Sequence, residues 1–296
     1  MSKPKIDREY LESFNKECNL KYFGKWVENI TELKRSYTNS FPFGYIKIDS
    51  FLNEEYAEKI YNKYPLDFDN WHKYYNPLEV KYANDKINSL DKPIKDLFYI
   101  LSTDEIIKIF SEITDINGLT FDPYLHGAGL HCHPRNGRLN MHLDYEKHPT
   151  LDKMERRLNI IFFLTKDWKN EWNGDNQLWT KDMKECIVKT YPKFNSAIIF
   201  QTNNISWHGL PEKIKCPENI FRKSFAYYYI SPLESDSNDD KFGNDGTGYR
   251  TKASFVKRPT DQYMQQMEEL YKIRPFRRIE KEDMKRIWPE WTPDLF

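Results

Sequence analysis

Short apolar runs separated by turn residues fill the chain from about Leu119 onward. Glycine, asparagine or proline stands in many of the gaps, which is the pattern of short β-strands joined by tight turns. About eight such strands within roughly a hundred residues favour a double-sheet jelly roll or a small barrel. We predict strands over residues 124–133, 138–144, 157–165, 176–180, 186–191, 196–201, 205–208 and 222–230.

The strand predicted over 157–165 is almost continuously apolar, unlike its neighbours. Such a strand is expected to be covered on both faces of its sheet. Residues 1–38 carry apolar side chains at roughly helical spacing, which predicts one or two helices. These N-terminal helices are the expected cover of the sheet.

Between these regions, the pattern predicts one strand at residues 45–48 and then three helices. An asparagine cap starts the first helix, over residues 53–64. The second is expected to begin near Ser89 or Pro93. The third begins at Ser102, because Ser102 and Glu105 have the spacing of a capping box.

Two segments lack the hydrophobic periodicity of either a helix or a strand. Residues 65–90 are irregular and aromatic, which fits either a loop near a pocket mouth or structural filler. Residues 231–250 are rich in serine, aspartate, asparagine and glycine, and contain little that a core could bury. We interpret the second segment as a mobile loop, which is either a lid or irrelevant to function.

The tail from Lys252 onward predicts a strand at 253–256 and then a helix containing Met267. A basic and aromatic run follows, over residues 274–291. This run is typical of a solvated helix face with tryptophan anchors, and a partner site is the alternative. We therefore predict a single domain with four parts. They are a helical part with one or two strands (1–118), the strand-rich core (119–231), a mobile loop (232–251) and a C-terminal strand and helix extension (252–296).

Charge and cysteine usage narrow the function classes. The 45 basic and 45 acidic residues balance to a formal net charge of zero. No single-sign field is present, so neither nucleic acid nor an anionic membrane is an expected partner. The four cysteines are widely spaced, and no secretory signal or long apolar stretch is present. We therefore expect a soluble cytoplasmic protein with reduced thiols.

Candidate chemistry begins at the end of the strand predicted over 138–144. Side chains two positions apart on a strand point the same way, so His142 and Asp144 share one face. A further histidine, His208, follows a later apolar run. Two imidazoles and one carboxylate on a β scaffold, with open coordination positions, form the ligand set of a non-haem Fe(II) oxygenase. The alternative for His208 is a buried histidine of the core.

A basic residue and a hydroxyl open the strand predicted over 222–230. Arg222 and Ser224 project to one side by the same two-residue period. A guanidinium fork beside a hydroxyl is suited to binding a buried carboxylate in a bidentate manner. A surface ion pair is the alternative for Arg222. The sequence thus predicts a metal site followed by a carboxylate clamp.

Residues from about 41 to 231 resemble the Fe(II)- and 2-oxoglutarate-dependent oxygenases of the prolyl-4-hydroxylase type, and a bacterial-style branch most of all. The resemblance is specific for the superfamily and nearly uninformative about substrate. It rests on the stretches 42–52, 125–131, 137–149 (which includes His142 and Asp144), 156–168, 178–179, 192–200, 206–209 and 222–229.

The resemblance implies a mostly β fold with helical cover: a double-stranded β-helix, or jelly roll, with N-terminal helices packed on one sheet. It implies that His142, Asp144 and His208 bind iron. It further implies that Arg222, assisted by Ser224, pairs with the distal carboxylate of 2-oxoglutarate.

Three positions depart from the family pattern or extend it. The place usually held by a tyrosine before the His-x-Asp motif is taken by His131 or His133, so the second cosubstrate contact is one of these two. Asn159 stands where the family tends to place a polar residue that faces inward, and it is a further candidate contact. The usual paired glycines before residue 178 are replaced by the run 174–177, which we expect to alter only a turn.

The reaction that the resemblance implies consumes 2-oxoglutarate and O2 and releases succinate and CO2. Its cofactors are Fe(II), 2-oxoglutarate as cosubstrate, O2, and ascorbate as a stimulating reductant. Related halogenases lack the carboxylate ligand, so Asp144 favours hydroxylation. The expected substrate is a prolyl or peptidyl group, an amino acid or another small metabolite; the oligomeric state is not indicated. A metal-binding jelly-roll module without turnover is the alternative, and zero net charge disfavours a nucleic-acid demethylase.

Overall fold

The computed structural model describes residues 3–233, 250, 252–262 and 264–293. The helices in this part of the chain are α1 (Arg8–Asn15), α2 (Ile30–Thr38), α3 (Glu54–Lys63), α4 (Lys92–Leu101), α5 (Asp104–Thr114), α6 (Gln265–Ile273) and α7 (Lys281–Ile287). The strands are β1 (Tyr45–Asp49), β2 (His72–Asn76), β3 (Glu79–Asn84), β4 (Thr120–Phe121), β5 (Gly129–His133), β6 (Arg138–Leu143), β7 (Met154–Phe163), β8 (Asn176–Trp179), β9 (Cys186–Thr190), β10 (Ser196–Gln201), β11 (His208–Leu210), β12 (Arg222–Pro232) and β13 (Ser254–Phe255).

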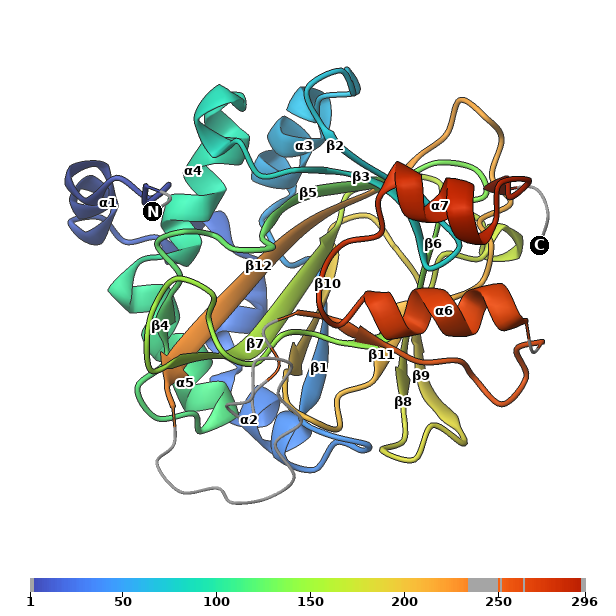
Figure 1. The fold of residues 1–296 in the computed structure, drawn as a ribbon. Helices are drawn as coiled ribbons and strands as arrows, with labels where there is room; N and C mark the ends of the chain where they lie inside the picture. Colours follow the sequence, from blue (N-terminus) through green and yellow to red (C-terminus); the bar gives the residue numbers. More distant parts are fainter. Residues whose placement is uncertain (1–2, 234–249, 251, 263, 294–296) are drawn as a thin grey trace.

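The strands form one antiparallel sheet that curls into a nearly closed barrel (Figure 1). Along the hydrogen-bonded path, β10, β7, β12 and β5 form one half, and β6, β11, β8 and β9 form the other. The chain passes back and forth between these halves from β5 to β12, as in a double-stranded β-helix. The predicted jelly roll with helical cover is therefore confirmed.

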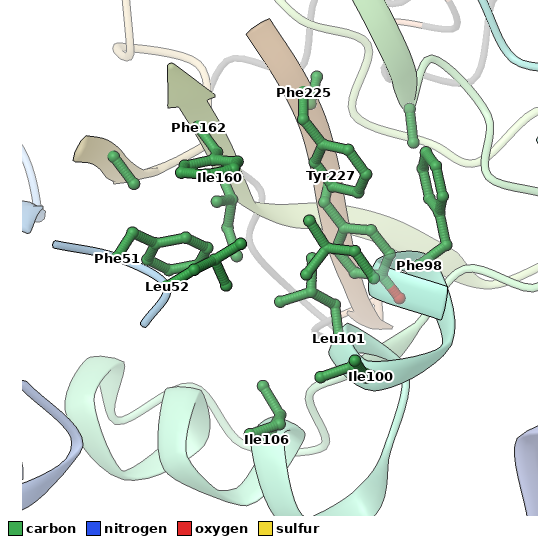
Figure 2. Close-up of a cluster of buried hydrophobic side chains, with 14 of the residues drawn as sticks. Phe51, Leu52, Phe98, Ile100, Leu101, Ile106, Ile160, Phe162, Phe225 and Tyr227 are labelled. Carbon is green, nitrogen blue, oxygen red and sulfur yellow. The ribbon is translucent and has the colours of Figure 1, made fainter. Parts of the chain in front are cut away.

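The N-terminal helices cover one half of the barrel, and the largest apolar core lies between them and β7 and β12 (Figure 2). Phe98 of α4 packs on Phe225 of β12, with ring centroids 4.3 Å apart. Tyr229 of β12 contacts Phe110 of α5 and donates a hydrogen bond to the carbonyl of Leu101. The opposite face of the same strands is free to line the barrel interior.

The eight strands predicted for the core correspond to β5 to β12, with shifted starts at β5, β7 and β11. The first begins at Gly129 rather than at 124, because the Asp122 carboxylate accepts hydrogen bonds from the backbone N–H groups of Tyr124 and His126. These bonds fold the segment into a turn. The strand predicted over 205–208 begins at His208 instead, so this histidine opens β11.

The hairpin of β2 and β3 was not predicted, since residues 65–90 read as irregular. In β3 the side chains that face the barrel interior are polar where a strand usually has apolar ones. They are Glu79 and Lys81, followed by Ala83. An interior-facing row of charged residues hides the usual strand signal. The hairpin joins the barrel because β3 pairs with both β5 and β6.

One of the two predicted helix caps is confirmed. The side chain of Asn53 accepts a hydrogen bond from the backbone N–H of Tyr56 and caps α3. The capping box at Ser102 is wrong, because Ser102 ends α4 and Thr103 is the N-cap of α5. The Ser102 hydroxyl bonds to the Phe98 carbonyl at 2.7 Å and to the Tyr227 hydroxyl at 2.6 Å. It ties the helical layer to β12.

The C-terminal extension lies against the barrel, beside β6 (Figure 1). Trp288 and Trp291 are 5% and 6% exposed, and they join an apolar cluster with Leu78 and Val80 of the β2–β3 hairpin. Most charged side chains of residues 274–291 stay exposed while the tryptophans are buried, so the predicted solvated helix face with tryptophan anchors is confirmed. Most of the loop predicted over 232–251 lies outside the described residues. Among the helices that are described, none is long and apolar enough to cross a membrane.

Candidate active site

Three metal-ligand side chains meet at the barrel interior. His142 of β6 and His208 of β11 stand directly opposite each other in the strand register, and Asp144 follows the end of β6. The Nε2 atoms of His142 and His208 lie 3.8 Å and 3.6 Å from the two carboxylate oxygens of Asp144. One ligand atom from each residue lies within 4.8 Å of the others. The two-residue period of a strand and the pairing of β6 with β11 bring the three together.

Backbone carbonyl groups fix the orientation of both imidazoles. Nδ1 of His142 lies 2.9 Å from the Asn140 carbonyl, and Nδ1 of His208 lies 2.9 Å from the Ser206 carbonyl. A carbonyl can only accept, so each Nδ1 carries the hydrogen and each Nε2 presents its lone pair to Asp144. Burial lowers the pKa of His142 to about 3 and also lowers the pKa of His208. Both rings are therefore neutral near pH 7.

This donor set fits a divalent metal ion. Two nitrogen lone pairs and a carboxylate face one another, and none of the three groups offers a hydrogen to the others. Such a convergence of acceptors is stabilised by a cation at its centre. Open space on the cavity side leaves positions for further ligands.

Arg156, which was not predicted as a site residue, pairs with Asp144. Its Nη1 lies 3.1 Å from Asp144 Oδ2, and its Nη2 donates to the His126 carbonyl at 2.7 Å. The guanidinium is enclosed by the rings of Tyr145 and Tyr228, whose centroids lie 3.8 Å and 3.4 Å from Cζ. Burial alone would raise the pKa of Asp144, but the Arg156 charge helps to hold it below its usual value. Asp144 is therefore ionised.

A β-bulge explains why Arg156 was missed. Tyr229 of β12 pairs with Leu158 of β7, but the next residue, Ile230, pairs with Arg156. Arg157 is thus an extra residue, and the simple alternation from Leu158 backward fails. The only signal was an arginine pair at the start of an apolar strand, which also suits an exposed strand end.

Arg222 lies on the same interior face, where β12 pairs with β5. Its side chain is 1% exposed, and Nε donates to the Gly174 carbonyl at 2.6 Å. Nη2 has no hydrogen-bond partner, and no carboxylate in the described residues forms an ion pair with this guanidinium. Burial lowers its pKa to about 10, so it stays charged at neutral pH. A buried, incompletely paired guanidinium is suited to an anionic ligand.

The turn before β8 contributes to this clamp. Gly174 has a φ of +85°, where side-chain-bearing residues are strained, and a Cβ at this position would lie only 3.2 Å from Cδ of Arg222. The Gly174 carbonyl orients Arg222, and the expectation that the replaced glycine alters only a turn stays a prediction. Ser224 lies two positions along the same strand, and its hydroxyl is 3.5 Å from the His131 carbonyl.

The remaining candidates also line the cavity. His131 and His133 both face it from β5, and neither ring nitrogen of His133 has a partner. Burial lowers the pKa of both imidazoles. Which of the two contacts a cosubstrate stays open. Asn159 of β7 reaches Asp144 Oδ2 with Nδ2 at 3.4 Å, while its buried Oδ1 has no partner.

The cavity has a volume of about 450 Å³, within the usual range of small-molecule sites. The β2–β3 hairpin flanks it, which agrees with the first of the two interpretations of residues 65–90, a segment near a pocket mouth. The tail also lines it, which was not expected: Phe255 of β13 stacks on His142, with ring centroids 5.0 Å apart. Arg274 and Arg278 line its outer part.

Residues 128–230 match the family model of the 2OG-Fe(II) oxygenase superfamily. This span contains the His142, Asp144 and His208 cluster as well as Arg222. This stretch of the chain is similar to the 2OG-Fe(II) oxygenase superfamily. The match implies Fe(II), 2-oxoglutarate and O2 as the cofactor and cosubstrates, and the cluster of acceptor atoms in this chain fits the iron.

One solved structure supports the fold of this chain, and two others are less similar. A prolyl hydroxylase from Trichoplax adhaerens, in complex with a hypoxia inducible factor oxygen degradation domain peptide fragment, matches with a TM-score of 0.50 and 13% identity, over 77% of this chain and 95% of that one. A Pseudomonas putida prolyl-4-hydroxylase gives a TM-score of 0.47 at 12% identity, over 69% and 99%. A prolyl 4-hydroxylase from Phytophthora capsici gives 0.47 at 16%, over 74% and 70%. No sequence among the curated proteins matches significantly.

Proposed function

We propose that this oxygenase hydroxylates an unactivated C–H bond of a peptidyl, amino-acid or other small-metabolite substrate. The overall conversion is 2-oxoglutarate plus O2 plus R–H to succinate plus CO2 plus R–OH. One observation carries the proposal: two neutral imidazole nitrogens and an ionised carboxylate converge at the wall of a buried cavity that also contains an unpaired arginine.

The assignment of roles follows the geometry of each side chain. His142, Asp144 and His208 would hold Fe(II) on one side only, since all three come from the β6 and β11 side of the cavity. The iron, when bound, supplies the activation of O2 that removes a hydrogen from carbon. The intact carboxylate at Asp144 supports hydroxylation, because it occupies a position that a halide would need.

The protein's own contribution is positioning. Arg222 would bind the distal carboxylate of 2-oxoglutarate through its free Nη2, while its Nε stays on Gly174. Ser224 lies on the same side of β12 and supplies a hydroxyl to that carboxylate. Arg156 would hold one Asp144 oxygen so that the other is directed to the metal. Burial of these groups excludes water from the reacting centre.

Succinate formation tests the proposal. Purified protein with Fe(II), 2-oxoglutarate and O2 is incubated with a panel of peptides, amino acids and sugar acids, and succinate is measured. Asp144→Ala should abolish succinate formation. Asp152→Ala, which removes an 82% exposed carboxylate, is the matched control and should leave it unchanged.

Normal succinate formation by Asp144→Ala, or formation that does not need Fe(II), would overturn the proposal. Binding of 2-oxoglutarate without O2 consumption on any member of the panel would instead favour a jelly-roll binding module without turnover.

A further inference from the structure

The outer wall of the cavity is formed by the β2–β3 hairpin and the C-terminal extension. Lys81 of β3 points into the cavity with its side chain 11% exposed. Its Nζ lies 3.8 Å from Glu79 Oε2 and 5.1 Å from the centroid of the Tyr74 ring. A lysine amine in this position is a buried cation with one distant carboxylate partner.

That carboxylate is shared. Nε of Arg274 lies 3.1 Å from Glu79 Oε1, and the Arg274 side chain is 10% exposed. One carboxylate, itself 2% exposed, thus faces two largely buried cations, so this wall carries an excess positive charge. Arg278 adds a further cation at the cavity edge, 5.2 Å from the Tyr74 ring.

The other carboxylates in the described lining are already engaged. Asp144 belongs to the metal cluster and pairs with Arg156. Asp85 pairs with Lys5 at 2.7 Å and with His72 at 3.3 Å. Glu280 caps the first turn of α7. None of them forms an ion pair with Lys81, and burial lowers the pKa of this amine. Leaving a buried cation incompletely paired costs free energy that a bound anion would return.

The ring of Phe255 lies between this wall and the metal cluster. The Arg274 guanidinium carbon is 5.1 Å from the Phe255 ring centroid, and the same ring stacks on His142. A small molecule whose anionic group contacts Lys81 and Arg274 can therefore extend past Phe255 to the reacting centre. Arg222, which is assigned to the cosubstrate, comes from a different strand.

We infer that the substrate is an anionic small molecule, with a carboxylate or phosphate group held by Lys81, Arg274 and Arg278. This inference rests on the proposed function, because it places that anion beside the iron and 2-oxoglutarate. It distinguishes this chain's cavity from one that receives an uncharged peptide segment.

Matched pairs of probes test the inference on protein loaded with Mn(II) and 2-oxoglutarate. The pairs are L-glutamate with L-glutamine, and O-phospho-L-serine with L-serine, so that the carboxylate and phosphate sources are separated. Binding is read from paramagnetic relaxation of the probe's protons. We expect at least one anionic member to bind at least tenfold more tightly than its neutral partner.

Variants then assign the preference to the wall. Lys81→Gln should lose it, and Lys81→Arg should restore it. Lys73→Gln removes an exposed lysine from the same hairpin and should have no effect. The affinity for 2-oxoglutarate should stay within about twofold of the wild-type value in all three.

The possible failures are distinguishable. If wild-type protein binds 2-oxoglutarate but shows no preference for either anionic probe, the anionic-substrate inference is overturned and the proposed function stands. If Lys81→Gln loses 2-oxoglutarate binding, Lys81 belongs to the cosubstrate site and the inference is again overturned. If the wild type binds no 2-oxoglutarate, the proposed function itself fails.

Discussion

At the scale of single residues, Asp144 connects the two histidines to Arg156. It faces the Nε2 atoms of His142 and His208, and it also pairs with Arg156. The histidines and Asp144 could be predicted, because strand alternation puts side chains two apart on one face. Arg222 and Ser224 follow the same rule. Arg156 could not be predicted, since a bulge reverses the alternation at the start of β7.

Replacing Arg156 tests its proposed support of the metal ligand. Arg156→Gln removes the charge paired with Asp144, and we expect metal affinity to fall by about 10–100-fold, as for other groups that orient metal ligands. Mn(II) titration followed by electron paramagnetic resonance measures this. Arg157→Gln alters the neighbouring arginine, which lies outside the cavity lining, and is the control. Unchanged Mn(II) affinity in Arg156→Gln would refute this role.

At the scale of elements, the strands that were predicted are those with an apolar face or an apolar run, such as β7 and β10. The β2–β3 hairpin was not predicted, because the side chains of β3 that face inward are charged and line the cavity instead of packing in the core. The start of α5 was displaced by one residue, since the Ser102 hydroxyl bonds to Phe98 and Tyr227 instead of capping a helix. Functional and tertiary demands thus override local signals at these positions.

The contact between the helical layer and β12 gives a stability prediction. Phe98 is fully buried and packs on Phe225, so Phe98→Ala should destabilise the protein by about 3–5 kcal/mol. Phe276→Ala is the control, because Phe276 is 66% exposed and should contribute little. Urea unfolding followed by tryptophan fluorescence measures both. Equal effects of the two substitutions would contradict the assigned core.

At the scale of the whole molecule, the C-terminal extension completes the cavity. Its tryptophans pack beside the β2–β3 hairpin, and its arginines reach the cavity edge. Sequence pattern alone could not show this docking, because a basic, aromatic helix also suits a solvated surface. The partner surface, Leu78 and Val80, lies about two hundred residues away in the chain and in a segment without a clear period.

An ion pair within the extension makes its stability depend on pH. A hydrogen bond from Arg277 is the main cause that lowers the pKa of Asp283 from 3.8 to about 2. Because the folded-state pKa is the lower one, this stabilisation is full above about pH 4 and is lost as the pH falls toward 2. Arg277 is 52% exposed, so solvent screening keeps the contribution of this ion pair to stability small.

Asp283→Asn should therefore lower the Tm at about pH 7, and the difference from wild type should shrink at about pH 3. Glu282→Gln removes an adjacent exposed carboxylate and is the control. Differential scanning calorimetry at both pH values provides the measurement. A difference that grows toward low pH would show that the sign of this coupling is wrong.

The central claim is that one cavity holds a metal ion on His142, Asp144 and His208 and a 2-oxoglutarate carboxylate on Arg222. Anaerobic calorimetry with Fe(II), followed by 2-oxoglutarate, tests it most directly. The wild type should bind one equivalent of each. Asp144→Ala should bind neither, and Arg222→Gln should keep the metal but lose at least tenfold in 2-oxoglutarate affinity, with circular dichroism confirming that each variant is folded. Wild-type affinity for 2-oxoglutarate in folded Arg222→Gln, or binding that needs no metal, would contradict the account.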